Sequence, residues 1–159
     1  MPAPGIGQPN ITPPSPFPLT FNISEVTATA PGLPPTTIFA AGVNATLSTT
    51  LEINGTALLT PILAAAINGA GLSIFHHLEN LETGAMSTIA GGTLAPAAFG
   101  AAPGTTVTVT SPPFTLAIPA GFDAGTYRVL THVHTGGLIA GAVTAFHDAL
   151  VLMVVPPPG

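Results

Sequence analysis

The feature that most constrains the fold of this chain is an alternation of apolar and polar residues along residues 37–53. Its apolar and small side chains fall on one parity, together with one threonine: Phe39, Ala41, Val43, Ala45, Leu47, Thr49, Leu51 and Ile53. Because successive side chains of a β-strand point to opposite faces, this period of two predicts one long half-buried strand or a bent pair of strands. The Asn54–Gly55 pair that follows predicts a turn.

Further strand candidates follow along the chain, separated by glycine- and proline-containing stretches. They cover residues 22–30, 72–84, 105–119, 125–135 and 141–155, with a break at Pro112–Pro113. Residues 90–104 are rich in alanine, glycine and proline, and we expect a long loop there. Residues 56–71 allow either a short helix or an apolar loop. Roughly seven strands at this spacing predict an all-β sandwich.

Proline divides the chain into three parts. Residues 1–35 contain ten of the 19 prolines, which disfavour a helix and favour extended, polyproline-like backbone. We therefore expect a Pro-rich arm at 1–35, a sandwich domain at 36–155 and a Pro-rich tail at 156–159. Within the arm, residues 22–30 could form a first edge strand. Docking on a neighbouring subunit is the simplest role for the arm. The arm residues expected to contact that neighbour are Pro13, Pro14 and Phe17.

Ionic side chains are scarce along the whole sequence. Only 4% of residues are Asp, Glu, Lys or Arg, lysine is absent, and Arg128 is the single arginine. A protein that binds nucleic acid neutralises several phosphates with Lys or Arg, and an anionic membrane surface attracts the same side chains. The composition therefore argues against both partners. Uninterrupted apolar runs of about 20 residues, which membrane insertion requires, are missing, and the first residues lack the pattern of a signal peptide.

Sparse charge also predicts association. Interspersed surface charges normally oppose aggregation, so we expect this chain to contact copies of itself or a larger shell. The leading hypothesis is a non-enzymatic structural component of a bacteriophage virion, such as a capsid decoration or cement protein. The alternative is an extracellular filament or surface-layer subunit at the cell surface, whose arm donates a strand to the next subunit.

The stretch DAGTYRV at residues 123–129 resembles the corner at the start of strand F in immunoglobulin-like domains. In that family the tyrosine hydroxyl bonds back to the backbone near the corner. The resemblance implies this role for Tyr127, in a corner formed with Asp123 and Gly125, and an immunoglobulin-like antiparallel β-sandwich. Val129 stands where the family has cysteine, and the chain contains neither cysteine nor tryptophan. The antibody-type core is therefore not implied.

Strand parity then places two histidines on one surface. If Tyr127 and Val129 face the core, Leu130, His132 and His134 point outward, which predicts a contact surface or a site. Two histidines separated by one residue lie about 7 Å apart on a strand face, close enough to share a metal ion. His76 or His77, His147 and Asp148 could complete that set. A metal-binding β-sandwich module that uses His132 and His134 is therefore a third candidate function. The other interpretation is that these imidazoles are exposed or interfacial and bind no metal.

No pattern in the sequence indicates catalysis. The G-x-S-x-G nucleophile elbow is missing, and a phosphate-binding G-x-x-x-x-G-K-[ST] loop is impossible without lysine. Arg128 is the only permanently cationic side chain that could stabilise a developing negative charge. We therefore expect a protein that is not an enzyme and carries no cofactor.

Overall fold

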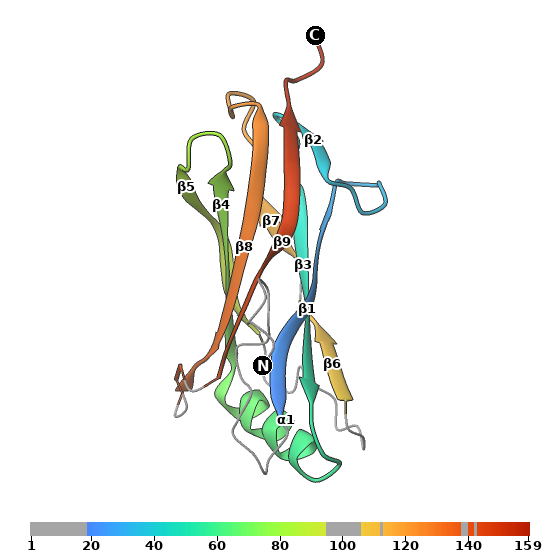
Figure 1. Cartoon of the computed structure of the whole chain (residues 1–159). Coiled ribbons are helices and arrows are strands. Elements are labelled where there is room, and N and C mark those ends of the chain that lie inside the picture. The colour runs from blue at the N-terminus through green and yellow to red at the C-terminus, as the bar shows by residue number, and fades with distance from the viewer. Residues whose placement is uncertain (1–18, 95–105, 112, 138–139, 142) are drawn as a thin grey trace, which may run out of the picture.

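The computed structural model describes residues 19–94, 106–111, 113–137, 140–141 and 143–159. Within these residues, nine strands and one helix form an elongated sandwich of two sheets (Figure 1). The four-stranded sheet consists of β1 (Thr20–Thr29), β3 (Ala45–Asn54), β6 (Thr106–Thr110) and β7 (Phe114–Leu116). The five-stranded sheet has the order β2 (Ile38–Ala40), β9 (Thr144–Val155), β8 (Gly125–Thr135), β4 (Leu72–Asn80) and β5 (Met86–Leu94). The prediction of an immunoglobulin-like β-sandwich is confirmed.

Neighbouring strands are antiparallel throughout, except that the short strand β2 runs parallel to β9. The described residues do not contain a helix that is both long enough and apolar enough to cross a bilayer.

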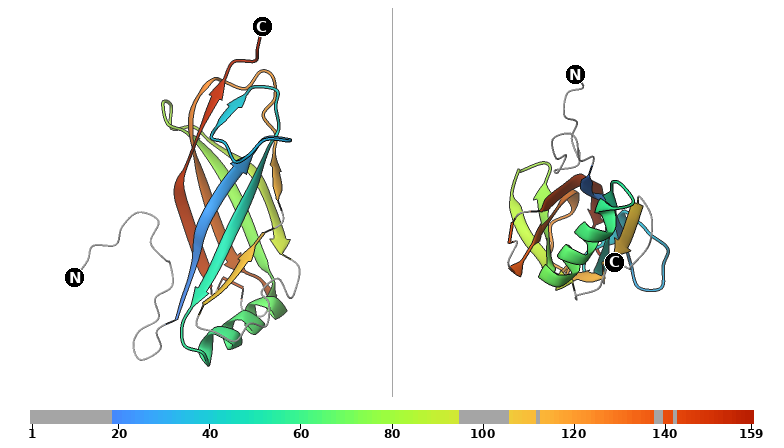
Figure 2. Two further views of the ribbon diagram at one scale, coloured as in Figure 1. Left: turned by 90° about the vertical axis from the view of Figure 1, so that its right-hand side faces the viewer. Right: turned by 90° about the horizontal axis from the view of Figure 1, so that it is seen from below.

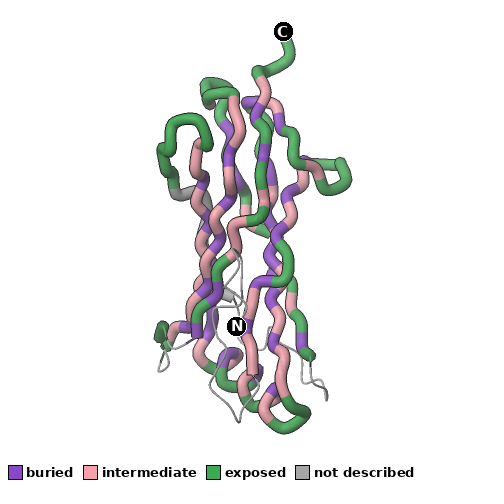
Figure 3. The backbone as a smooth tube through the Cα atoms, viewed as in Figure 1, coloured by how far each residue is buried: buried purple, intermediate pink, exposed green. Residues whose placement is uncertain are grey.

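The alternation at residues 37–53 forms the bent pair of strands, β2 and β3. Every second residue of β3, from Ala45 to Ile53, is buried, as the alternating colours of Figure 3 show. The bend lies at Gly42, whose φ of 91° favours glycine because it has no Cβ. Beyond this bend Val43 leaves the buried parity and is 37% exposed.

Two apolar clusters fill the space between the sheets. Their large, fully buried members are Phe21, Leu51, Ile53, Ile67, Leu72 and Ile74 in one cluster, and Phe39, Leu47, Leu116, Ile118 and Leu152 in the other. On the strands β3, β4 and β8, one polar residue stands between the members of the two clusters: Thr49, His76 and Thr131, each fully buried. We call these three residues the polar layer.

Residues 56–71 contain the helix α1 (Leu59–Ala70), which lies across one end of the sandwich (Figure 2). Of the two alternatives for this stretch, the helix is therefore the one found. Thr60, Ala64 and Ile67 are its buried residues, a spacing that places them on one helix face. Pro61 lies in the first turn, where the missing N–H costs no helical hydrogen bond.

Two boundaries differ from the sequence prediction. Residues 90–94 belong to β5 rather than to a loop, because the edge of β4 supplies partners for their backbone out to the pair Leu72 and Leu94. Residues 95–104 lie outside the described residues. The sandwich also begins earlier than residue 36: β1 lies within the predicted arm, and its Phe21 is fully buried.

The two ends of the chain differ in what can be described. The remainder of the predicted arm, residues 1–18 with Pro13, Pro14 and Phe17, lies outside the described residues. Residues 156–159 follow β9 as an exposed segment without regular secondary structure.

Candidate functional site

The corner at residues 123–127 has the contact that the family resemblance implied. The Tyr127 hydroxyl donates a hydrogen bond of 2.8 Å to the backbone carbonyl of Asp123. The Asn80 amide donates in turn to the Tyr127 oxygen at 3.3 Å, and the ring of Phe122 packs against the Tyr127 ring. Gly125 is the first residue of β8. These contacts fix where β8 begins, so the corner positions the surface that β8 carries.

The outward-facing residues of β8 lie on the solvent side of the five-stranded sheet. Tyr127, Val129, Thr131 and Val133 are buried, whereas Arg128, Leu130, His132 and His134 are half-buried. This is the parity expected from the sequence. Leu130, His132 and His134 are therefore available to a partner that covers this sheet.

Four aromatic rings from β4 and β8 form a continuous stack on this surface. The ring centroids of Phe75 and His132 lie 5.0 Å apart, those of Phe75 and His134 lie 5.6 Å apart, and those of His77 and His132 lie 5.4 Å apart. The interplanar angles of these pairs are 19°, 16° and 8°. The β4–β8 register produces the stack, because it pairs Phe75 directly with His132.

The stack does not favour the predicted metal site. The rings of His132 and His134 are inclined by only 19° with their centroids 6.1 Å apart. A metal ligand uses the nitrogen lone pair in the ring plane, so near-parallel rings direct their lone pairs side by side rather than to one point. His147 pairs with the inward-facing Thr131 and lies on the other face of the sheet. Among the described residues, no three His, Cys, Asp or Glu side chains group together as metal ligands do.

The electrostatics of the stack favour a neutral His132 ring. Desolvation, followed by the nearby imidazoles of His77 and His134, lowers the pKa of His132. The one ion pair of the described residues, between Arg128 Nε and Glu79 Oε2 at 3.4 Å, lies on the same sheet face. This face therefore combines stacked aromatic rings with a charged pair that is already bonded internally.

Exposed apolar side chains surround the stack. Met86 of β5 is 54% exposed, and Phe146, Val151 and Met153 of β9 are 39%, 41% and 46% exposed. The strand register places all four on the outer face, opposite Glu79, His132, Arg128 and Thr126, respectively. Ile38 of β2, beside Met153, extends the surface. We call this surface the aromatic face. Its members are Ile38, Phe75, His77, Met86, Leu130, His132, His134, Phe146, Val151 and Met153.

The sequence predicted three members of the aromatic face as outward-facing residues, Leu130, His132 and His134, and indicated His77 only as a possible metal ligand. The other six members were not predicted. Phe75 and His77 share a parity within residues 72–84, a signal that was available in the alternation of that stretch. Val151 and Met153 were not separable from the core residues of their strand, because β9 is apolar on both parities near its end.

The outer face of the four-stranded sheet has a different composition. It presents a row of hydroxyl side chains, which we call the hydroxyl face: Thr20, Thr27, Thr29, Thr46, Ser48, Thr50, Thr106, Thr108, Thr110 and Thr115. Several of these groups bond to one another or to their neighbours. The Thr29 and Thr46 hydroxyls lie 2.7 Å apart, and Thr106 donates to the Asn54 side chain at 2.6 Å. This face is polar with few charges.

Comparison with known proteins gives a fold likeness only. No protein-family model and no curated protein matches the sequence. The C-terminal domain of wzt is similar with a TM-score of 0.49 and 8% identity, covering 91% of this chain and 81% of that one. The CARDB domain of the PF1109 protein from Pyrococcus furiosus was solved in complex with di-metal ions. It is similar with a TM-score of 0.38 and 14% sequence identity, and the match covers 88% of this chain and 94% of that domain. AvmM, which catalyses macrocyclization in alchivemycin A biosynthesis, is similar with a TM-score of 0.38 and 9% sequence identity. That match covers 87% of this chain and 93% of AvmM.

Proposed function

We propose that this protein is a non-enzymatic structural module that associates with copies of itself, or with a larger shell, through the aromatic face. One observation carries the proposal: exposed and half-buried apolar or aromatic side chains from all five strands gather on one outer sheet face. Monomeric soluble proteins rarely expose a large contiguous apolar patch, and such patches mark interaction sites.

Because the aromatic face carries few charges, burying it has a small desolvation free energy. Removing an ion from water costs several kcal/mol unless it is paired. Arg128 and Glu79 already pair with each other, and the lowered pKa of His132 keeps that ring neutral near pH 7. Covering the aromatic face therefore gives the favourable free energy of burying apolar surface, and the desolvation of polar groups opposes it only weakly.

The flat outer face also suits a second copy of the same surface. In a two-fold association residue i of one copy meets residue j of the other and j meets i, so the patch must be self-complementary. An uncharged face satisfies this condition, because no like charges are brought together other than the two paired groups.

We further propose that the assembly is a bacteriophage virion, in which the protein would decorate or cement the capsid. Composition supports this placement, since a charge-poor exterior suits close packing in a shell. Gene neighbourhood tests it. Capsid and tail genes beside this gene would support the placement, whereas genes for an export or surface-layer system would favour the extracellular filament.

Sedimentation velocity of the full chain over a range of concentrations tests the association. In the test variant, Val151→Thr is combined with Met153→Thr, which removes apolar area while keeping strand-compatible side chains. A matched control combines Val43→Thr with Ile62→Thr, two apolar residues of 37% and 57% exposure that lie outside the aromatic face. We expect the test variant to raise the dissociation constant at least about tenfold, and the control to leave it unchanged. A wild-type chain that stays monomeric at high concentration would contradict the proposal.

A further inference from the structure

One side of the sandwich presents two open strand edges next to each other. β1 forms the outer edge of the four-stranded sheet and lies beside β9 (Figure 1). β2 pairs with β9 only from Met153 to Val155. Among the described residues, none pairs with the second edge of β9 between Thr144 and Val151, or with that of β1 between Thr20 and Thr27. Open edges of this kind are templates for an added strand.

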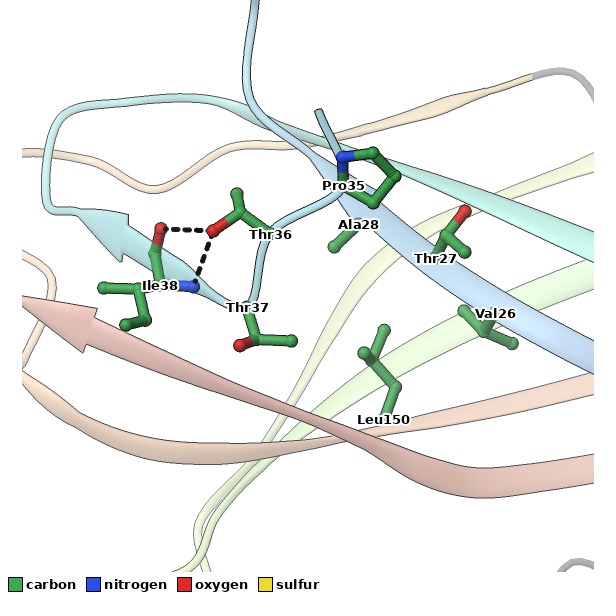
Figure 4. A pocket seen from close by; sticks show the side chains of 8 residues that line it. All are labelled: Val26, Thr27, Ala28, Pro35, Thr36, Thr37, Ile38 and Leu150. Carbon is green, nitrogen blue, oxygen red and sulfur yellow. Dashed lines mark hydrogen bonds between the residues drawn. The ribbon is translucent and has the colours of Figure 1, made fainter. Parts of the chain in front are cut away.

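A groove of about 370 Å³ lies between these two edges. Its apolar lining comes from Val26 and Ala28 of β1 and Leu150 of β9, as Figure 4 shows. The segment Pro35–Ile38 closes one end, and the Thr36 hydroxyl holds this wall by bonding to the backbone of Ile38. At Ala28 the edge of β1 is already used, because the Thr36 N–H donates to the Ala28 carbonyl at 2.9 Å. Before Ala28 the groove combines an apolar floor with the unpaired edges of β1 and β9, which is what strand addition requires.

The β9 side of this region also contains polar atoms that have no partner among the described residues. The register shifts in β9 between His147 and Leu150, so the strand bulges there. His147 Nδ1 and Asp148 Oδ1 are buried at this bulge without a hydrogen bond. Buried polar atoms are normally paired. Asp148 precedes the groove residue Leu150 by two positions but does not itself line the groove.

We propose that this groove binds the N-terminal segment of a second copy of the chain, with residues 5–12 as the docked stretch. Eighteen residues precede the described part of the chain, and they enter at β1, the strand that forms one wall of the groove. Residues 5–12 read GIGQPNIT and contain a single proline, whereas Pro13, Pro14, Pro16 and Pro18 follow. Ile11 is the side chain that covers the apolar floor.

A second copy is favoured over the same copy for a geometric reason. To dock on its own groove, the chain would have to reverse within residues 13–18, immediately before β1. Four prolines in these six residues favour a stiff, extended backbone that advances about 3.1 Å per residue. From this sequence we expect a linker that reverses poorly, which favours docking on a second copy over docking on the same copy.

This contact differs from the association through the aromatic face. A segment of one chain binds a groove of the next, so the contact is head-to-tail and propagates unless it closes into a ring. Ile38 belongs to the aromatic face and also lines the groove, whereas Val151 and Met153, the residues substituted to test the aromatic face, do not line it. Either proposal can therefore fail while the other stands.

Disulfide trapping tests the docking directly, because the chain contains no cysteine. Full-length Asn10→Cys, next to the Ile11 anchor, is mixed under mild oxidation with full-length Thr37→Cys, whose side chain lines the groove. The matched control partner is Thr108→Cys on the hydroxyl face, which is also exposed. Docking raises the effective concentration of the two thiols, so we expect at least about tenfold more cross-linked dimer with Thr37→Cys than with the control.

Two further variants separate the outcomes. Adding Ile11→Asp to Asn10→Cys should reduce the cross-link to the control level, because a carboxylate cannot enter an apolar groove unpaired. A chain with both Asn10→Cys and Thr37→Cys should form linked multimers. Equal cross-linking to Thr37→Cys and Thr108→Cys would overturn the proposal, and so would a bridge formed only within one chain.

Discussion

The two outer faces of the sandwich have few ionic side chains, but they differ in what takes the place of those side chains. Both belong to a chain in which only 4% of residues are charged. The hydroxyl face of the four-stranded sheet is covered by threonine and serine, which bond to water and to one another. The aromatic face of the five-stranded sheet has stacked rings and exposed Met, Val and Ile side chains. Hydroxyl groups can therefore replace ionic groups as a solvated surface, and the aromatic face is the one suited to burial against protein.

A lysine placed on the aromatic face and a lysine placed on the hydroxyl face should differ most in their effect on the dissociation constant of self-association. Val151→Lys should weaken association by about a thousandfold, because burying an unpaired ammonium in the contact costs several kcal/mol. Thr108→Lys, on the hydroxyl face, should leave the dissociation constant within about twofold, since surface substitutions away from contacts are nearly neutral. Sedimentation velocity measures both. If the two lysines had equal effects, the faces would not differ in function.

Lowering the pH should destabilise the five-stranded sheet before the four-stranded sheet. All five histidines lie on strands of the five-stranded sheet, and the fully buried one is His76. Burial, followed by His77 and His132, lowers the pKa of His76 from 6.5 to about 4. The unfolded chain therefore binds this proton more readily than the folded one, so stability is greatest above pH 6.5 and decreases as the pH falls toward 4.

The expected loss of unfolding free energy between pH 6.5 and 4 is roughly 3 kcal/mol. Urea unfolding at several pH values measures it, and His76→Gln, which keeps a polar group near the Thr131 hydroxyl, should remove most of the dependence. Hydrogen exchange at pH 5 should show β4 and β8 losing protection before β3. An unchanged pH dependence in His76→Gln would show that burial of this ring is not the cause.

The corner that begins β8 should contribute a smaller, local effect. Tyr127→Phe removes the 2.8 Å hydrogen bond to the Asp123 carbonyl while keeping the packed ring. We expect a loss of about 1 kcal/mol in the free energy of unfolding, the usual net value of one hydrogen bond. Chemical denaturation measures it. The proposed role of the corner in stabilising β8 would be wrong if Tyr127→Phe were as stable as wild type.

The hydroxyl face should show the smallest effect on stability. Thr46→Val deletes a hydroxyl that bonds to Thr29, but solvent can pair with the remaining groups. The change in unfolding free energy should be under about 0.5 kcal/mol. Denaturation curves check this value. A loss of several kcal/mol would show that the hydroxyls form a structural network rather than a solvated surface.

Local patterns predicted most of the strands. The alternation at residues 37–53 and the parity of β8 were readable because each strand has one buried and one exposed face. The strand β5 was missed because Gly91 and Gly92 resemble a loop, and only pairing with β4 makes this stretch a strand. The residue pattern of β5 alone does not indicate that β4 pairs with it.

The candidate site was harder to predict, because it depends on register between strands far apart in the sequence. Phe75 meets His132 only because β4 and β8 pair with one particular offset. For the same reason the structure does not bring His132, His134 and His147 together. His147 pairs with Thr131, which puts it on the inner parity, and the strand bulges directly after it.

Methionine oxidation gives the most direct test that the aromatic face is buried against protein. The chain has three methionines, of which Met86 and Met153 belong to this face and Met1 does not. Dilute peroxide is applied to the full-length protein over a range of concentrations, and mass spectrometry gives the rate at each site. The account predicts that oxidation of Met86 and Met153 slows as concentration rises, while that of Met1 stays constant. Rates at Met86 and Met153 that do not change with concentration would contradict it.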